Sequence, residues 1–386
     1  MHRMSSPFFK IFLSLLAIVS FSTFSVAQHD GHGHDHSEPG HSHQPADAHA
    51  KADEKFNAGE VIMHHITDSH EWHFATIGHT HVSLPLPVIL YNTTHGFSTF
   101  LYNKFDHGHK THDGYYLNDK HKIASLDSSN FYDFSITKNV ASMMIGALIL
   151  ILIFTSVASR YKRNPDKAPK GFQNLMEVII SFVRDEVVKP MLGKHTDKYL
   201  PYLLTIFFFI WINNLLGLLP GAANVTGNIA VTMTLAVFTL IITLFSSNRN
   251  YWHHMFTAPG APLGVKIILV PIEVLGNLIT KPGALMIRLF ANMTAGHLIV
   301  LSFLSLIFIF AELFGSVAGF GISIFSVLFA TFIYALELLV AVLQAYIFVN
   351  LSALFISEAV VDHHHQHEEV GAGMVTDGAG HPTKHH

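Results

Sequence analysis

The chain has 386 residues, of which half are hydrophobic and only 13% are charged, and its formal net charge at pH 7 is −4. A soluble domain devotes about a quarter of its residues to charge, so this composition favours a protein that crosses a membrane several times. The small net charge gives no reason to expect a nucleic-acid partner. The sequence has no cysteine, which excludes disulfides, thiol catalysis and cysteine metal sites.

Residues 1–27 are predicted to be a secretory signal peptide. Arg3 and Lys10 give a basic start, IFLSLLAIVSF an apolar core, and SVA before Gln28 resembles a small-residue cleavage site. The alternative is an uncleaved first membrane helix. Cleavage would leave the mature amino terminus outside the cytoplasm.

Two external segments are predicted to follow. Residues 28–60 are rich in His, Asp, Gly and Ala and poor in apolar residues, which indicates a disordered, His-rich arm. Residues 61–135 contain short β-prone runs, such as PVILYNTTHGFSTFLYNKF, broken by Asn, Asp, Gly and Pro. They predict a small external β-rich module.

Residues 136–360 have the pattern of a membrane domain. The segment 140–159 is long enough to cross ~30 Å of hydrocarbon. The next stretch, RYKRNPDKAPK, holds five Lys or Arg within eleven residues. The positive-inside rule places that loop in the cytoplasm, in agreement with an external amino terminus. Residues 171–195 are amphipathic and too charged to span, so an interfacial helix along the cytoplasmic surface is expected.

A helical hairpin is predicted next. Residues 199–221 cross outward and residues 229–245 return. The outer turn has no Lys or Arg, whereas the returning helix is followed by Arg249, so the charges again fall on the inner side. With the two helices that follow, the fold class is an all-α polytopic membrane protein with five crossings. The acidic, His-rich tail, residues 361–386, ends in the cytoplasm.

Two unusually long helices are predicted at the end of this domain. Pro271 and Pro282 interrupt the approach, so residues 262–280 are expected to enter the membrane obliquely. The helices run from Gly283 to about Phe314 and from about Ile322 to Ser357, with ELFGSVAGFG as the turn. At ~1.5 Å per residue each exceeds ~45 Å, so both must tilt strongly or run partly along the membrane.

The sequence MIRLFANMTAGH places Arg288 within the first long helix. A charge at the bilayer centre costs at least ~2.5–3.5 kcal/mol, and arginine cannot lose its proton because its pKa lies above ~12. One alternative is a structural pair with a carboxylate of the same chain. The neighbours favour another role, because Ala284, Ala291, Asn292 and Ala295 share its helix face. Such small-residue faces occur where membrane helices approach closely, so Arg288 is predicted to be presented to another helix.

His297 lies nine residues after Arg288, ~13 Å along the helix and half a turn out of phase, so it is expected to face the interior of this protein. On the last helix Glu337 and Gln344 share a face. Antiparallel packing would bring Glu337 near His297 and Gln344 near Arg288, although an ordinary interhelical hydrogen bond also explains Gln344. A His–Glu pair within the membrane can pass protons, because both groups can titrate near neutrality there.

Four asparagines cluster near the outer end of the hairpin at residues 199–245. They are Asn213, Asn214, Asn224 and Asn228. Amide side chains can line a wet entrance, but loop polarity alone explains at least Asn224 and Asn228.

Four motifs agree in order and spacing with a known family. IRLFANMTAGHLI, ELLVAVLQAYIFVNLSALFI, INNLLGLLP and NVTGNIAVTMTLAVF resemble subunit a of the F-type ATP synthase over roughly residues 136–360. The resemblance implies five crossings in a bacterial inner membrane and two tilted helices against a rotating ring of c subunits. It also implies the b subunits of the peripheral stalk and the remainder of the complex as partners. The external module and the His-rich arm depart from the common pattern.

The resemblance also assigns roles. It makes Arg288 the family's essential arginine, facing the ring carboxylate, and Gln344 its glutamine neighbour. In many bacterial members of this family the position of His297 is Glu and that of Glu337 is His. This chain has the two exchanged, as mitochondrial forms do, and the exchange keeps one imidazole and one carboxylate. Two half-channels are implied, with Asn214, His297 and Glu337 on the external side and Glu273 on the cytoplasmic side. No cofactor or catalytic site is expected, since the chain has no phosphate-cradling GxxxxGK[ST] loop; H⁺ or Na⁺ as the coupling ion stays open.

The thirty histidines suggest an alternative interpretation, that the protein is a metal transporter, because imidazole binds Zn²⁺, Ni²⁺ and Cu²⁺. A transporter needs ligands at membrane depth, however, and His297 is the only histidine in the predicted spans. No metal site is therefore predicted in the membrane. For the external arm, incidental metal binding and a merely solvated segment both remain open.

Overall fold

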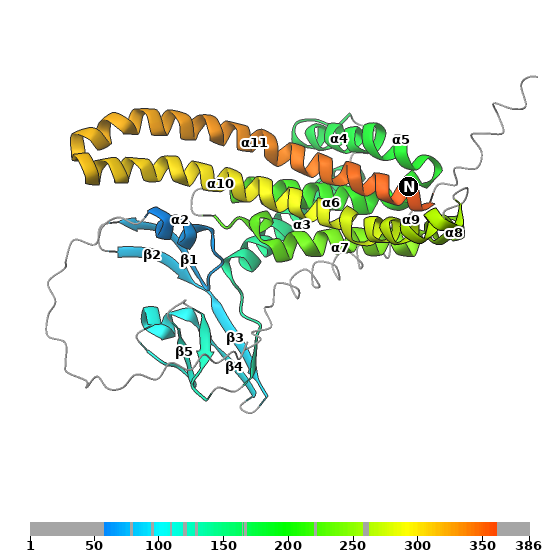
Figure 1. Ribbon diagram of the computed structural model, residues 1–386. Coiled ribbons are helices and arrows are strands. Elements are labelled where there is room, and N and C mark those ends of the chain that lie inside the picture. The colour runs from blue at the N-terminus through cyan, green and yellow to red at the C-terminus, as the bar shows by residue number, and fades with distance from the viewer. Residues whose placement is uncertain are drawn as a thin grey trace, which may run out of the picture.

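The computed structural model describes residues 58–77, 80–93, 96–108, 110–118, 122–127, 130–163, 165, 168–219, 222–257 and 262–360. The predicted signal peptide, most of the His-rich arm and the tail from residue 361 lie outside these ranges. Within them, a small α/β unit precedes a long helical bundle (Figure 1).

The α/β unit contains one short α-helix, one 3-10 helix and antiparallel strands. The helix α2 (Ala58–Ile66) begins just before the expected boundary at residue 61. The remaining elements are β1 (Glu71–Ile77), β2 (Thr80–Pro85), β3 (Pro87–Asn92), β4 (Gly96–Leu101), η1 (Tyr102–Gly108), β5 (Tyr115–Leu117), β6 (Ile123–Ser125) and β7 (Phe131–Asp133). β1 pairs with β2, β5 pairs with β6, and β3 lies between β4 and β7.

One face of the three-stranded sheet carries the core of this unit. Val88 and Leu90 of β3 are fully buried with Phe100 of β4. They pack against Phe105 of η1 and Tyr115 of β5. Alternation along β3 turns the intervening residues to the opposite face, since successive side chains of a strand point to opposite sides.

The α/β unit is joined to the bundle at the start of α3 (Lys138–Arg163). The backbone N–H of Asn139 donates to Oδ1 of Asp68 at 3.2 Å. The backbone N–H of Lys138 donates to the carbonyl of Ser69 at 2.9 Å. These bonds satisfy donors that a helix N-terminus leaves free. The helix α2 also lies against the long helix α10 (Lys281–Phe314), so the unit contacts the bundle in two places.

The rest of the bundle is helical in all described residues apart from short connections. Its elements are α4 (Phe172–Phe182), η2 (Val183–Val188), α5 (Lys189–Leu192), η3 (Gly193–His195), α6 (Thr196–Gly217), η4 (Val225–Gly227), α7 (Ile229–Ser246), α8 (Arg249–Thr257), α9 (Leu263–Leu275), η5 (Gly276–Thr280) and α11 (Ser316–Val360). Among the described residues, five helical runs are long and apolar enough to cross a membrane. A polytopic helical membrane protein is thereby confirmed.

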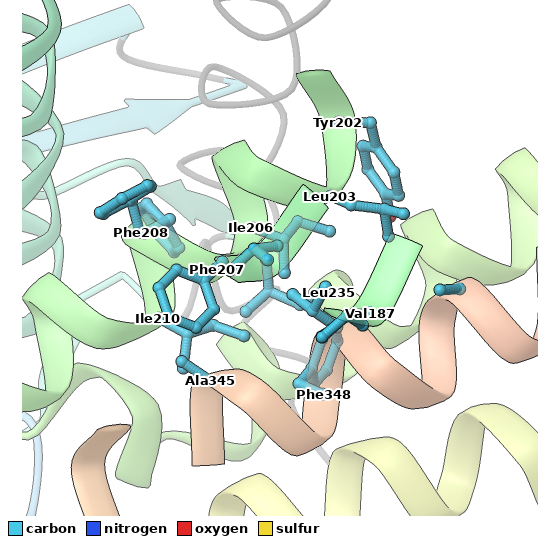
Figure 2. Packing of buried hydrophobic residues seen from close by; sticks show 14 of the residues in the cluster. Val187, Tyr202, Leu203, Ile206, Phe207, Phe208, Ile210, Leu235, Ala345 and Phe348 are labelled. Carbon is cyan, nitrogen blue, oxygen red and sulfur yellow. The ribbon is translucent and has the colours of Figure 1, made fainter. Parts of the chain in front are cut away.

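Side chains of α6 fill the centre of the bundle. Figure 2 shows Ile206 and Phe207 of α6 gathered with Leu235 of α7 and with Ala345 and Phe348 of α11, and all five are buried. Because Ala345 is small, the backbone of α11 can approach α6 closely. This contact holds the middle of α11, and with it the hairpin of α10 and α11, against the rest of the protein.

The turn between the two long helices is much shorter than predicted. α10 continues to Phe314 and α11 begins at Ser316, so Gly315 alone forms the turn. Its φ of 86° is a conformation that glycine adopts without the steric cost other residues incur. Beyond the turn, a Cβ added to Gly319 would lie 2.7 Å from the Cβ of Ala311, so the helices cross tightly there. The predicted turn, ELFGSVAGFG, contains Gly315 but is too long: the first helix ends at Phe314 as predicted, whereas the second begins at Ser316 and not near Ile322.

The two prolines do not interrupt the approach to α10. Pro271 lies inside α9, and Pro282 lies in the first turn of α10, where the missing N–H costs little. The π-helical segment η5 links α9 to α10 without a loop. The wider π turn keeps the chain helical while changing the direction of its side chains.

Candidate functional site

The long helices α10 and α11 run antiparallel and share a line of polar side-chain pairs. These pairs are Lys281 with Glu358, Asn292 with Gln344, and His297 with Glu337. As residue numbers rise along α10 they fall along α11, so one register satisfies all three. The seam therefore carries ionisable or amide groups at three levels of the hairpin.

Arg288 lies on the face of α10 that points away from the rest of this protein, which is called the outward face below. This face is exposed and consists of the residues predicted from their spacing, namely Ala284, Arg288, Ala291, Asn292 and Ala295. The buried residues of the same helix stretch are Leu285, Leu289 and Met293. Among the residues that the structure describes, no carboxylate forms an ion pair with Arg288. A structural pair with a carboxylate of the described residues is therefore not what holds the guanidinium.

Gln344 makes an interhelical hydrogen bond. Its Oε1 accepts from Nδ2 of Asn292 at 2.9 Å, and Gln344 is buried. In the described part of the chain no hydrogen bond joins Gln344 to Arg288. Asn292 is four residues after Arg288 on the outward face, so the bond fixes this face of α10 one turn from the arginine.

His297 of α10 and Glu337 of α11 come together between the two helices. Nδ1 of His297 lies 3.8 Å from Oε1 of Glu337, and the side chains are only 18% and 8% exposed. Within the described residues, neither Nδ1 of His297 nor either carboxylate oxygen of Glu337 has a hydrogen-bond partner. Both groups can hold and release a proton, and one bridging water can connect polar atoms at this separation. The arrangement is suited to passing a proton.

Gly296 makes room for the Glu337 carboxylate. A Cβ added at residue 296 would overlap Oε1 of Glu337 and would lie 2.9 Å from its Cδ. A glycine beside the histidine is therefore required by the position of the carboxylate. Sequence reasoning missed this residue, although the small residue next to His297 was a visible signal.

Asn214 is buried with its amide fully engaged. Its Nδ2 donates to the carbonyl of Ala341 at 3.2 Å, and its Oδ1 accepts from the hydroxyl of Thr226 at 2.6 Å. Ala341 is one turn from Glu337 on α11. Asn214 thus ties α6 to α11 close to the His–Glu pair.

The other three asparagines of the predicted cluster also make local bonds. Asn224 and Asn228 accept from backbone N–H groups of Gly227 and Ala230, as loop polarity suggested. Nδ2 of Asn224 also donates to the carbonyl of Met293 on α10 at 3.2 Å, so this asparagine ties the loop to the long helix. Asn213 donates to the carbonyl of its own helix at Phe209.

A second group of titratable residues lies near the start of α10. Oε1 of Glu273 on α9 is 3.0 Å from Nδ1 of His254 on α8, and Glu273 is 26% exposed. Lys281 pairs with Glu358. Burial raises the pKa of Tyr251 on α8, and the carboxylates of Glu358 and Glu273 act in the same direction. Sequence reasoning found Glu273 but missed the Lys281–Glu358 pair, which joins residues 77 positions apart.

No group of three or more His, Asp or Glu in the described ranges could hold a metal ion. Five apolar helices long enough to cross a membrane define a multi-pass membrane protein, and the last two hold a His–Glu pair whose groups can exchange protons.

Comparison with known families gives a specific match. Residues 140–357 match the family described as ATP synthase A chain, and residues 61–142 match a domain of unknown function, DUF8433. The chain is 41% identical to ATP synthase subunit a 2 of Chlorobaculum tepidum, covering 88% of this chain and 84% of that protein. It is 48% identical to ATP synthase subunit a of Chloroherpeton thalassium over 62% of this chain and 71% of that one.

The chain belongs to the ATP synthase A chain family. Membership makes it a proton-translocating membrane subunit of a bacterial ATP synthase, and not the part that catalyses ATP formation.

Proposed function

We propose that this chain is the stator subunit that delivers protons to a rotating c-ring and receives them from it in an F-type ATP synthase. The observation that carries the proposal is the seam of α10 and α11. It combines the buried His297–Glu337 pair with an outward-facing Arg288 that no described carboxylate neutralises. The proposed partners are the c-ring, the b subunits of the peripheral stalk, the rest of the complex and the lipid bilayer.

The mechanism follows from the electrostatics of the outward face. A protonated ring carboxylate is neutral and can face lipid, whereas an ionised one cannot do so cheaply. The guanidinium of Arg288 favours ionisation of the carboxylate that arrives opposite it, because an opposite charge stabilises the ionised form. An arginine side chain carries a permanent positive charge in proteins. Arg288 also repels protons and so resists a direct leak between the two channels.

The seam supplies the external half-channel in this proposal. Protons enter beside Asn214, pass between His297 and Glu337, and reach the ring carboxylate. Asn292 and Gln344 hold the outward face of α10 in register by their hydrogen bond. The asparagine at 214 acts as a positioning residue, because both ends of its amide are already bonded.

The cytoplasmic half-channel begins at Glu273 in this proposal. Its partly exposed carboxylate next to His254 offers a released proton a titratable acceptor close to the start of α10. Lys281 and Glu358 lie between this group and Arg288 along the helix.

The proposed orientation places the amino-terminal segments outside. Residues 1–27 are the signal peptide, residues 28–60 the arm, residues 61–135 the periplasmic module, and the tail from residue 361 is cytoplasmic. The helix α4 lies along the inner surface. In support, α4 exposes an apolar stripe beside a polar one, as interfacial helices do. The apolar stripe consists of Phe172, Leu175, Val178 and Phe182.

The orientation is tested by labelling. The chain has no native cysteine, so Asp47→Cys and Pro165→Cys each introduce its only thiol, and labelling reports the position of that residue alone. A membrane-impermeant maleimide should label the cysteine at 47 in intact spheroplasts and the cysteine at 165 only after permeabilisation. Labelling of both from outside would contradict the five-crossing orientation.

The proton path is tested at Gly296. Gly296→Ala should slow ATP-driven proton pumping severalfold at matched enzyme content, because the added Cβ displaces the Glu337 carboxylate from its place beside His297. The displaced atoms are the end of a flexible side chain, so the complex should still assemble. Pumping is measured as acidification of proteoliposomes containing the whole ATP synthase.

Gly283→Ala is the matched control. It adds the same methyl group to the same helix, but apart from the adjoining backbone of α10 no atom of the described residues lies within 4 Å of the added Cβ. We expect normal pumping from this variant. Equal rates in the two glycine variants would contradict the assignment of the carboxylate position to the proton path.

A further inference from the structure

An aromatic row crosses the three-stranded sheet of the α/β unit. Tyr91 of β3 is opposite Phe97 of β4 and also opposite Tyr132 of β7. The ring centroids of Tyr91 and Phe97 are 4.7 Å apart, and those of Tyr91 and Tyr132 are 6.5 Å apart. Phe97 is 72% exposed and Tyr132 is 45% exposed. Three aromatic rings therefore form one continuous surface that the described residues leave largely uncovered.

The whole face that bears this row is uncharged. Its members, read from the register of the three strands, are Pro87, Ile89, Tyr91, Phe97, Thr99, Leu101 and Tyr132. Asp133, the nearest acid in sequence, belongs to the opposite face, where its carboxylate lies 3.5 Å from Nε2 of His70. A large exposed apolar face on a small unit marks a contact surface. We call these seven residues the aromatic face.

The aromatic face is held close to the membrane by the chain itself. The pairing with β3 continues past β7, because the N–H groups of Phe134 and Ile136 donate to the carbonyls of Ile89 and Pro87. α3 then begins at Lys138. Tyr132 is six residues before this helix, so it lies no more than about 22 Å from the start of a membrane-crossing segment. The bonds from α3 to Asp68 and Ser69 fix the junction.

The arrangement of the elements turns the aromatic face toward the bilayer. In Figure 1, β3 and β4 run sideways from the outer end of α3, roughly across the direction of the spanning helices. β5, which contacts η1, lies to the left of this sheet in the same view, on the side away from α3 and α7. These elements cover the core face with Val88, Leu90 and Phe100. The opposite, aromatic face therefore looks toward the level at which the bilayer surrounds α3.

We propose that the aromatic face docks in the headgroup region of the bilayer next to α3 and anchors the α/β unit there. Tyrosine rings are enriched at membrane interfaces, because they combine an apolar ring with a polar hydroxyl. An apolar face of this kind inserts ~5–10 Å, to the boundary of headgroups and acyl chains. Because α2 contacts α10, the anchor also holds α2 against the long helix. With the amino-terminal segments outside, as proposed above, this headgroup region belongs to the outer leaflet.

Site-directed spin labelling tests the docking. A nitroxide on Phe97→Cys, in the whole ATP synthase in lipid nanodiscs, should be accessible to oxygen and severalfold less accessible to aqueous nickel-EDDA than a control label. The control is Lys104→Cys, an exposed residue of η1, the helix that packs against the opposite face of the sheet. Leu101→Cys provides a second position on the aromatic face, so the test does not depend on one variant.

Two outcomes would overturn the proposal. Nickel-EDDA accessibility at residues 97 and 101 equal to that at residue 104 would place the aromatic face in water. Protection of both labels from oxygen as well as from nickel-EDDA would mean that protein covers the face, either another subunit or a second copy of this chain. Lipid contact at residues 97 and 101 with exposure at residue 104 would support it, whatever the cysteine labels at 47 and 165 show about orientation.

Discussion

Replacing Arg288 with alanine should abolish ATP-driven proton pumping and ATP synthesis while the complex still assembles. The side chain is exposed on the outward face of α10, and no described carboxylate would lose an ion-pair partner. The change should therefore cost little folding stability, because it leaves no unpaired buried charge in this chain. The variant loses the charge that, in the proposed mechanism, favours ionisation of the ring carboxylate. Synthesis and pumping are measured in proteoliposomes at matched enzyme content.

Arg288→Lys is expected to be severely impaired as well. Lysine keeps a positive charge, but it loses the planar, delocalised fork, and its ammonium can lose a proton when it is desolvated. Arg249→Ala is the control, since it removes another exposed arginine from the chain. That variant should couple normally. Near-normal synthesis in Arg288→Ala would refute the proposed role.

The His297–Glu337 pair gives the second large effect. His297→Ala or Glu337→Ala should slow proton entry much more than it lowers the amount of assembled enzyme. Exchanging the two groups, with His297→Glu and Glu337→His together, should restore more flux than the sum of the single changes predicts. The reason is that groups 3.8 Å apart depend on each other, and residues in contact couple by ~0.5–3 kcal/mol.

Proton flux is compared in the single variants, the exchanged double variant and a control. Thr331→Ala removes a polar group from α11 that is exposed and bonded only to its own helix backbone at Val327, so it should conduct normally. The proposed proton transfer between His297 and Glu337 is refuted if the alanine variants conduct like the control and the exchanged double variant does no better than the worse single variant. Gly296 limits the rescue, because the shape of the space beside residue 337 suits the carboxylate.

The spans and the faces of the helices could be predicted without the structure. A run of apolar residues long enough for the bilayer is a local property, and so is the position of charges at its ends. The outward face around Arg288 follows from helical periodicity alone, since three- and four-residue spacings place side chains on one face. For these reasons the number of crossings and the exposure of Ala284, Ala291 and Ala295 agree with the structure.

Pairings between distant residues were predicted less completely. Antiparallel packing of two long helices brought His297 to Glu337 as expected, because both are isolated polar groups on facing helices. The partner of Gln344 is Asn292, and Arg288 makes no hydrogen bond to it in the described residues. A shift of one turn between the helices changes every such contact, and sequence spacing does not specify that shift.

The sequence by itself therefore determined the class of protein, its candidate membrane spans and which isolated ionisable residues lie within them. Only the tertiary structure decided the single-residue turn at Gly315, the continuous helix through η5, and the space that Gly296 leaves for Glu337. Local patterns report length and periodicity, because each residue's hydropathy and spacing act along one helix. Register, close approach and turn length depend instead on how the side chains of separate helices interdigitate, as Ala345 of α11 does against α6.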